Sequence, residues 1–250
     1  MTEMRQVHAY DCALRGCVMV RDILRAIARV GVAGLVIGAG LVFAPSATAL
    51  PQTCPPNCDQ IPAGAWPAPS SIPLNDDAHW PLLAGVAVSA PAPHFRFEEF
   101  CGTPRLPDDP RAYAVAEKAA PARPAGLWQL QAQIMHWRGD TSAGGQSAQS
   151  VFNAANVALR LCPVTAPQFT VTFTTDAIDR MAAVLTGPGG LVVHQYVLSH
   201  PQSSTVSELV LWNTPVAGVS AQVPWPSVVD AGVFDAMSTP LCEAYLASCG

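Results

Sequence analysis

The second half of the chain alternates between a strand-like and a helix-like hydrophobic period. In "LWQLQAQIMHWR", residues 127–138, apolar side chains alternate with glutamines, which predicts a half-buried strand. The composition of the following "GDTSAGGQS" predicts a loop. "SAQSVFNAANVALRLC", residues 147–162, repeats its apolar residues at the helical period and predicts a helix capped by Ser147. "QFTVTFT", residues 168–174, alternates strictly and predicts another strand.

The remaining elements complete a mixed pattern. "DAIDRMAAVL", residues 176–185, fits a helix or a strand, and we favour a helix. "GGLVVHQYVLSH" and "TVSELVLWNT", joined by "PQSS", predict a β-hairpin. "WPSVVDAGVFDAM" begins with a capping box, Ser227 to Asp230, and predicts a helix followed by a C-terminal helix that Thr239 caps. This order predicts one α+β domain over residues 101–250, a mainly antiparallel sheet with helices on one face.

The segment before this domain is rich in proline. Residues 50–100 contain too many prolines for a regular helix or a central strand. Trp66 and Trp80 interrupt the segment, however, and a disordered stalk would not usually contain two tryptophans. We therefore expect a proline-rich extended arm that packs on the domain through its tryptophans.

An apolar run at residues 30–43 indicates export. It is shorter than the about 20 residues that a membrane span needs, and it is typical of a signal-peptide core. Ala47 and Ala49 are the small residues that a signal peptidase reads, so we expect residues 1–49 to be a signal peptide cleaved after Ala49. A start at Met19 would give a leader of ordinary length. An uncleaved anchor helix is the alternative, and it would be the chain's only contact with the membrane.

An even number of cysteines beyond Ala49 predicts three disulfide bonds in an exported chain. If residues 239–250 are helical, Cys242 and Cys249 lie about 10 Å apart along the axis. A disulfide needs Cα atoms within about 7 Å, so each of the two needs a distant partner. The candidates for disulfide bonding are Cys54, Cys58, Cys101, Cys162, Cys242 and Cys249.

The N-terminal pair supplies those distant partners. Two prolines in "TCPPNC" stiffen the connection between Cys54 and Cys58 and hold the two sulfur atoms apart. We predict that this pair bonds to the C-terminal cysteines, which leaves Cys101 to bond to Cys162. A bond between Cys54 and Cys58 themselves is the alternative.

The succession of elements resembles a group of exported actinobacterial domains. A strand, a Gly/Ser loop, the helix "SAQSVFNAANVALRLC" ending in a cysteine, and alternating strands resemble the extracellular sensor domains of receptor serine/threonine kinases and their secreted or lipoprotein relatives. The likeness covers roughly residues 125–215. It implies an α+β fold with disulfides and a cleft for a small ligand. The chain departs from the family in its proline-rich arm, its lack of a kinase domain and its ending "PLCEAYLASCG".

Charge and motifs exclude several classes of function. The chain has a formal net charge of −5 and no basic patch, so we expect no nucleic-acid partner. "GDTSAGG" differs from the serine-protease "GDSGG", and the G-x-S-x-G elbow of α/β-hydrolases is absent. The histidines lack the spacing of H-E-x-x-H, although His194 and His200 would approach His136 if their strands pair. The sequence thus predicts no catalytic residue, no metal and no cofactor.

Aromatic residues on the predicted strands are the remaining candidates for a site. Such side chains line apolar grooves while offering a polar atom, and they also fill ordinary cores. The candidate ligand-binding residues are Trp128, Trp137, Tyr196, Trp212 and His194.

The combined expectation is a secreted or extracytoplasmic cell-envelope protein. We predict a non-catalytic, sensor-like binding module for a small molecule or an envelope protein. A secreted hydrolase whose active site the sequence hides is the alternative. A structural envelope component is a third hypothesis.

Overall fold

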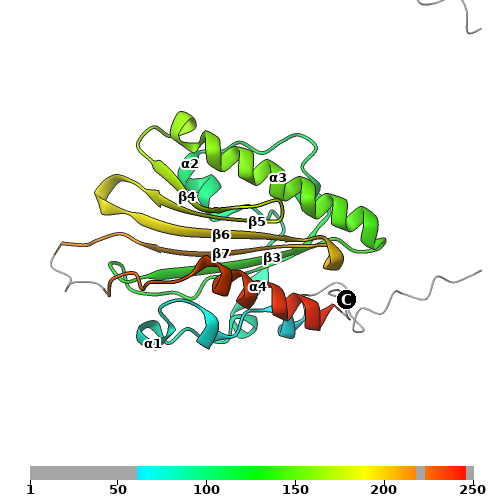
Figure 1. The fold of residues 1–250 in the computed structure, drawn as a ribbon, viewed down its shortest axis with the longest axis horizontal. Helices are drawn as coiled ribbons and strands as arrows, with labels where there is room; N and C mark the ends of the chain where they lie inside the picture. The colour runs from blue at the N-terminus through cyan, green and yellow to red at the C-terminus, as the bar shows by residue number, and fades with distance from the viewer. Residues whose placement is uncertain (1–60, 218–222, 246–250) are drawn as a thin grey trace, which may run out of the picture. The chain divides into compact units, whose positions relative to one another are not determined.

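Seven antiparallel strands form one sheet in the order β1-β2-β3-β7-β6-β5-β4. The structure, a computed structural model, describes residues 61–217 and 223–245, which fall in one compact unit (Figure 1). The predicted α+β class is therefore confirmed. The strands are β1 (Ala87–Ser89), β2 (Val115–Ala119), β3 (Gln129–His136), β4 (Thr170–Asp176), β5 (Arg180–Thr186), β6 (Val192–His200) and β7 (Thr205–Asn213).

Four α-helices accompany the sheet within the described ranges. They are α1 (Asn75–Ala78), α2 (Arg96–Cys101), α3 (Thr141–Thr165) and α4 (Asp230–Ala244). Short 3₁₀ turns join several elements, among them η5 (Pro110–Tyr113) before β2 and η7 (Pro201–Ser203) between β6 and β7. None of the helices described here is long and apolar enough to cross a membrane.

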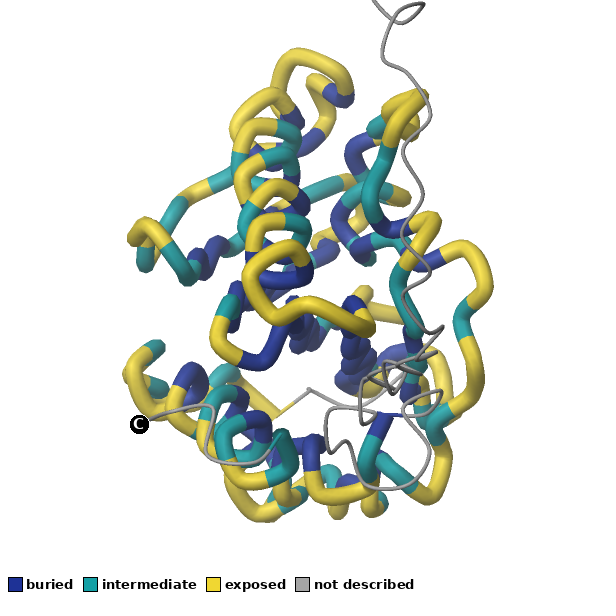
Figure 2. The backbone as a smooth tube through the Cα atoms, turned by 90° about the vertical axis from the view of Figure 1, so that its right-hand side faces the viewer, coloured by how far each residue is buried: buried dark blue, intermediate teal, exposed yellow. Residues whose placement is uncertain are grey.

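The sheet is covered on both faces, and its central strands bury apolar residues on each of them. Val197 of β6 and Val210 of β7 belong to a core with α2 and α3, whereas Leu198 and Leu209 belong to a second core with α4. Figure 1 shows α3 and α4 on opposite sides of the sheet, and Figure 2 shows buried residues between the layers. The expectation of helices on one face therefore holds for α2 and α3 only. Helix α4 packs on the other face.

Residues 61–83 of the predicted proline-rich arm pack on the α4 face, whereas Phe95 and Phe97, near its end, belong to the α3-side core. The predicted arm is not extended throughout, because α1, β1 and most of α2 form within it. Trp66 and Trp80 are buried in the core that contains α4, as is Ile61. Further along, β1 pairs with β2 and extends the sheet. The predicted signal peptide, residues 1–49, lies outside the described residues.

Helix α3 begins before the predicted helix start. Asp140 is its N-cap and accepts a hydrogen bond from the Ala143 backbone N–H at 2.8 Å, so Ser147 lies inside the helix. The predicted glycine-rich loop is wrong, because Gly144 and Gly145 form helical turns that pack against η7. A Cβ on Gly144 would lie 2.5 Å from the Ser204 side chain. The paired glycines thus permit a close approach between α3 and the β6–β7 turn.

The favoured helix over residues 176–185 is also wrong, because this segment contains β5. Met181 and Leu185 point into the α3-side core, and Ala182 points into the α4-side core. Pairing with β4 on one side and β6 on the other fixes the segment as a strand. Ile178, expected on the apolar face of a helix, is 85% exposed in the turn before β5.

Two predicted C-terminal helices are one helix in the structure. Helix α4 continues through Pro240, so Thr239 is not a cap. The predicted capping box at Ser227 does not form, because Val229 is the N-cap and Asp230 accepts a hydrogen bond from the Thr175 hydroxyl at 2.7 Å instead. This bond joins the start of α4 to strand β4.

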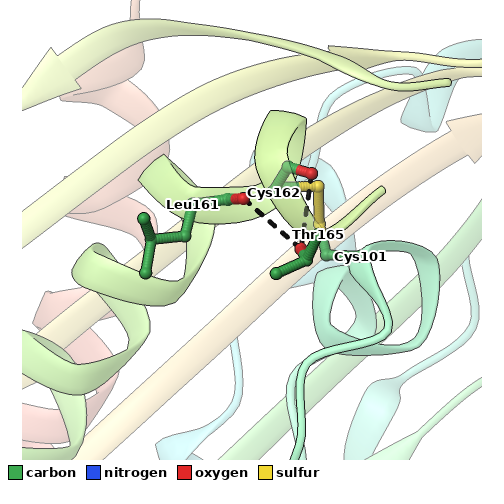
Figure 3. The surroundings of a disulfide bond; sticks show 4 residues. All are labelled: Cys101, Leu161, Cys162 and Thr165. Atoms are coloured by element: carbon green, nitrogen blue, oxygen red, sulfur yellow. Dashed lines mark hydrogen bonds between the residues drawn. A yellow bond between two sulfur atoms is a disulfide. The ribbon is translucent and has the colours of Figure 1, made fainter. Parts of the chain in front are cut away.

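A disulfide bond joins Cys101 at the end of α2 to Cys162 in α3, as predicted. Both residues are fully buried, and their Cα atoms lie 4.9 Å apart (Figure 3). The Thr165 hydroxyl donates to the backbone oxygens of Leu161 and Cys162 in the same last turns of α3 (Figure 3).

The other predicted disulfides involve residues beyond the described ranges. Cys242 of α4 is disulfide-bonded as well. Cys54, Cys58 and Cys249 lie outside the described residues, so the pairing of the chain's start with its end stays a prediction.

Candidate functional site

A pocket of about 380 Å³ opens where the segment before β3 meets the segment after β7. Gln129 and Trp212 face each other in the β3–β7 register and place the end of the sheet at the pocket. The volume lies within the range of small-molecule sites. Its lining includes Arg123, Gly126, Leu127, Gln129, Trp212 and Val216.

The Trp212 ring is held from the α2 side of the sheet. The Arg96 guanidinium lies 4.6 Å from the Trp212 ring centroid and 4.9 Å from that of Phe100. Arg96 also pairs with Glu99 one helical turn along α2. A guanidinium over an indole ring is a favourable cation–π contact. The pocket thus has an aromatic wall whose orientation is fixed by a neighbouring helix.

Arg123 brings a positive charge to the pocket. Its Nη1 donates to the Ala78 backbone oxygen at 2.6 Å, and its guanidinium lies 4.8 Å from the Trp80 ring centroid. Trp80 is itself fixed, since its Nε1 donates to the Pro73 oxygen at 2.8 Å. Within residues 61–217 and 223–245, Arg123 forms no ion pair. The arm therefore positions a cation that no described carboxylate neutralises.

A buried carboxylate lies on the same face of the sheet as Trp212. Glu208 of β7 accepts hydrogen bonds from the Arg96 backbone N–H at 2.7 Å and from Gln195 Nε2 at 2.9 Å. Gln131 Nε2 adds a third donor at 3.2 Å. Burial raises the pKa of Glu208 to about 7, although these hydrogen bonds lower it. Glu208 thereby anchors the start of α2, the helix that carries Arg96.

The predicted ligand-binding residues do not share one groove. Trp212 lines the pocket, whereas Trp137 is buried and donates from Nε1 to the Pro110 oxygen at 2.9 Å. Trp128, His194 and Tyr196 lie in the core on the opposite, α4 face, or pack on it. Strand alternation explains this division, because neighbouring positions of a strand point to opposite faces.

The three residues on the α4 face have protein partners. His194 stacks on Trp225 with a centroid distance of 3.5 Å, and Trp128 lies 5.2 Å from Trp225. Burial lowers the pKa of His194 to about 4. Tyr196 packs edge-on against Phe234. Trp128, His194 and Tyr196 therefore act as packing residues in this structure.

A serine and a histidine meet in the β6–β7 turn. Ser203 Oγ lies 2.6 Å from His200 Nδ1, and His200 Nε2 lies 3.6 Å from Cys242 Sγ. A hydrolase would need the serine exposed to substrate and the histidine oriented by a carboxylate. Ser203 is only 4% exposed, and the described neighbour of Nε2 is a disulfide sulfur. The burial of Ser203 therefore does not fit a nucleophile that must reach substrate.

His136, His194 and His200, which were expected to approach one another if their strands pair, do not form a metal-ligand cluster within the described residues. His136 stacks on Tyr245 and its Nδ1 lies 3.0 Å from the Ser203 oxygen. His200 and His194 have the separate surroundings given above. No group of three or more metal-ligating side chains occurs among the residues that the structure describes.

The comparisons with known proteins identify no relative of this chain. No family model matches the chain, and no curated protein and no solved structure shows a significant similarity to it. The likeness to extracellular sensor domains therefore stays a prediction.

Sequence reasoning missed Arg123, the charged residue of the pocket lining. "AAPARPAG" shows only an arginine between prolines, with no pattern that places it beside a tryptophan. Its position depends on the arm and on β3–β7 pairing, which join segments far apart in the sequence.

Proposed function

We propose that this protein is a non-catalytic binding module of the cell envelope or the extracellular space, and that it takes a small molecule in the pocket beside Trp212. One observation carries the proposal. The pocket combines an aromatic wall with an arginine that the arm holds in place and that no described carboxylate pairs with. Concave apolar surface with a few fixed polar groups is the usual composition of ligand sites.

The export part of the proposal is supported by the disulfide chemistry. Cys101 and Cys162 are bonded, and Cys242 is bonded as well. Disulfides of this structural kind persist in oxidising compartments and are rare in reducing ones. A disulfide-bonded chain fits the predicted signal peptide and the extracytoplasmic location.

A secreted hydrolase is the less favoured function. The described nucleophile–base pair, Ser203 and His200, is buried in a turn that packs against α3. Neither residue lines the pocket. Binding therefore needs no rearrangement of the fold, whereas hydrolysis at this pair would need the turn to open.

Native mass spectrometry of protein purified from its own host tests the proposal. We expect a co-purified small molecule on the wild-type protein and its loss from Val216→Trp, because Val216 lines the pocket and an indole there would fill it. Val164→Trp is the matched control, since Val164 is 74% exposed on α3 and lies away from the pocket lining. A ligand retained by Val216→Trp, or no ligand on wild type together with no stabilisation by a metabolite library, would contradict binding at this pocket.

A further inference from the structure

We infer that the pocket selects a small monocarboxylate, with the acid group on Arg123 and a planar apolar body against Trp212. This inference rests on the proposed function, because it names the chemical class of ligand for the same pocket. It follows from the fixed position of the Arg123 guanidinium, from the charges of the lining residues, and from the planar indole of Trp212 in the lining.

Arg123 is preorganised to receive an anion. A guanidinium carries five N–H donors in a planar fork, and the described contacts of Arg123 use one of them, on the Ala78 oxygen. Stacking over the Trp80 ring at 4.8 Å restricts the swing of the side chain. The side chain has therefore lost part of its conformational freedom before any ligand arrives, which reduces the entropic cost of binding.

The charge balance of the lining favours an anion with one negative charge. Among the described lining residues there is no Asp or Glu, and Arg123 is the charged one, in a chain whose net charge is −5. An arginine matches the two oxygens of a carboxylate with two parallel hydrogen bonds. One guanidinium balances one carboxylate. A dianionic phosphate would keep an unbalanced charge at this site.

The apolar wall favours a flat ligand body. Trp212 is a lining residue whose ring centroid lies 4.6 Å from the Arg96 guanidinium, and the apolar residues Leu127 and Val216 also line the pocket. Rings stack on indole in offset or tilted arrangements and gain more than buried area alone. A planar acid would therefore pair with the Arg123 guanidinium and also stack on Trp212. A sugar or a long alkyl chain would make only one of these two contacts.

The test compares indole-3-acetate with indole-3-acetamide, two probes that share the ring and differ in charge. Isothermal titration of the wild-type protein is expected to show at least about tenfold tighter binding of the acid, the gain typical of a charge-assisted hydrogen bond. Arg123→Gln should bring the two affinities to within about twofold of each other, because a neutral side chain no longer favours the charged acid over the amide. Arg123→Lys, which keeps the charge and loses the fork, should retain part of the preference.

Controls separate a local effect from unfolding. Arg160→Gln removes a cation from the exposed outer side of α3, where it pairs with Asp176, and should leave both affinities unchanged. Thermal unfolding of each variant shows whether loss of the Ala78 contact has loosened the arm. A variant that unfolds at the wild-type temperature and loses acid preference supports the inference.

Failure of the inference differs from failure of the proposed function. Equal wild-type affinity for acid and amide, with both lost in Val216→Trp, would leave a binding pocket but overturn carboxylate selection. The same holds if the co-purified molecule contains no carboxylate, or if Arg123→Gln keeps the full preference. A wild-type protein that binds neither probe and carries no ligand would overturn both.

Discussion

Glu208 gives the sharpest test of the energetics of this fold. It is 1% exposed and lies between the sheet and the start of α2, where its carboxylate accepts the Arg96 backbone N–H at 2.7 Å. Burial raises its pKa to about 7 from an ordinary value of 4.5. Replacing Glu208 by Gln keeps the shape and an acceptor oxygen but removes the charge. The variant should therefore lose the part of the pH dependence of stability that this one group contributes.

The sign and size of the effect follow from the two pKa values. Because the folded pKa is higher, the folded state holds an extra proton between pH 4.5 and about 7. Glu208 therefore contributes stability that is fully present below pH 4.5 and is lost as pH rises through 7. At about 1.4 kcal/mol per pKa unit, the total loss is about 3 kcal/mol, most of which falls between roughly pH 5 and pH 8.

Urea unfolding of wild type and Glu208→Gln at several pH values measures this loss. Only the difference between the two proteins isolates Glu208, because His194 works in the opposite direction. Burial lowers the pKa of His194 to about 4, so its contribution falls as the solution becomes more acidic. The stability of Glu208→Gln relative to wild type should rise by about 2–3 kcal/mol between roughly pH 5 and pH 8.

A constant difference between the two proteins across this pH range would refute the reasoning. It would mean that Glu208 ionises in the folded protein as it does in the unfolded chain. Glu243→Gln is the matched control, because it removes the same charge from an exposed position of α4. If both substitutions change the pH profile equally, net charge and not burial is the cause.

Three further predictions test the packing. Removing the Cys101–Cys162 bond in a double alanine variant should cost about 4 kcal/mol by the chain-entropy relation for a separation of 61 residues, and a loss under about 1 kcal/mol in urea unfolding would contradict this. Gly144→Ala should destabilise the protein by about 1–3 kcal/mol, because the new Cβ would lie 2.5 Å from the Ser204 side chain. Gly232→Ala in α4 should stabilise it by about 0.5–1 kcal/mol, because a Cβ there meets no atom within 4 Å. Equal thermal shifts of the two variants would disprove the packing argument. The wild type should lose about 3 kcal/mol of stability as pH falls from 6.5 through 4, because buried His194 resists protonation, and His194→Phe should abolish this loss. An unchanged acid-unfolding profile of the variant would rule this out.

The hairpin of β6 and β7 was predictable because its information is local. Two β-branched runs joined by a short polar turn specify an antiparallel pair from neighbouring residues alone. Strand β5 was not predictable in this way, because most residues of "RMAAVL" are good helix formers. Its state depends on β4 and β6, which pair with it on both edges, and strand preference reflects such neighbours more than the residues themselves.

The sequence pattern likewise did not predict which face of the sheet α4 covers. Both faces of β6 and β7 are apolar, so alternation does not say which face takes a given helix. Of the pocket, Trp212 was among the predicted residues because an aromatic on a strand is a visible signal. Arg123 was not, because its role comes from Trp80 and the Ala78 oxygen, more than 40 residues earlier in the chain.

The pocket is assembled from segments that separate constraints hold in place, and this has a thermodynamic consequence. The arm contributes Trp80 and thereby fixes Arg123; α2 contributes Arg96 and thereby fixes Trp212. The disulfide and Glu208 hold α2 at its two ends. A ligand of the proposed kind, paired with Arg123 and packed on Trp212, would bind only when the described part of the arm and α2 are both docked. By mass action, the same ligand must then stabilise the docking of both segments, so occupancy of the pocket and order in the arm rise together.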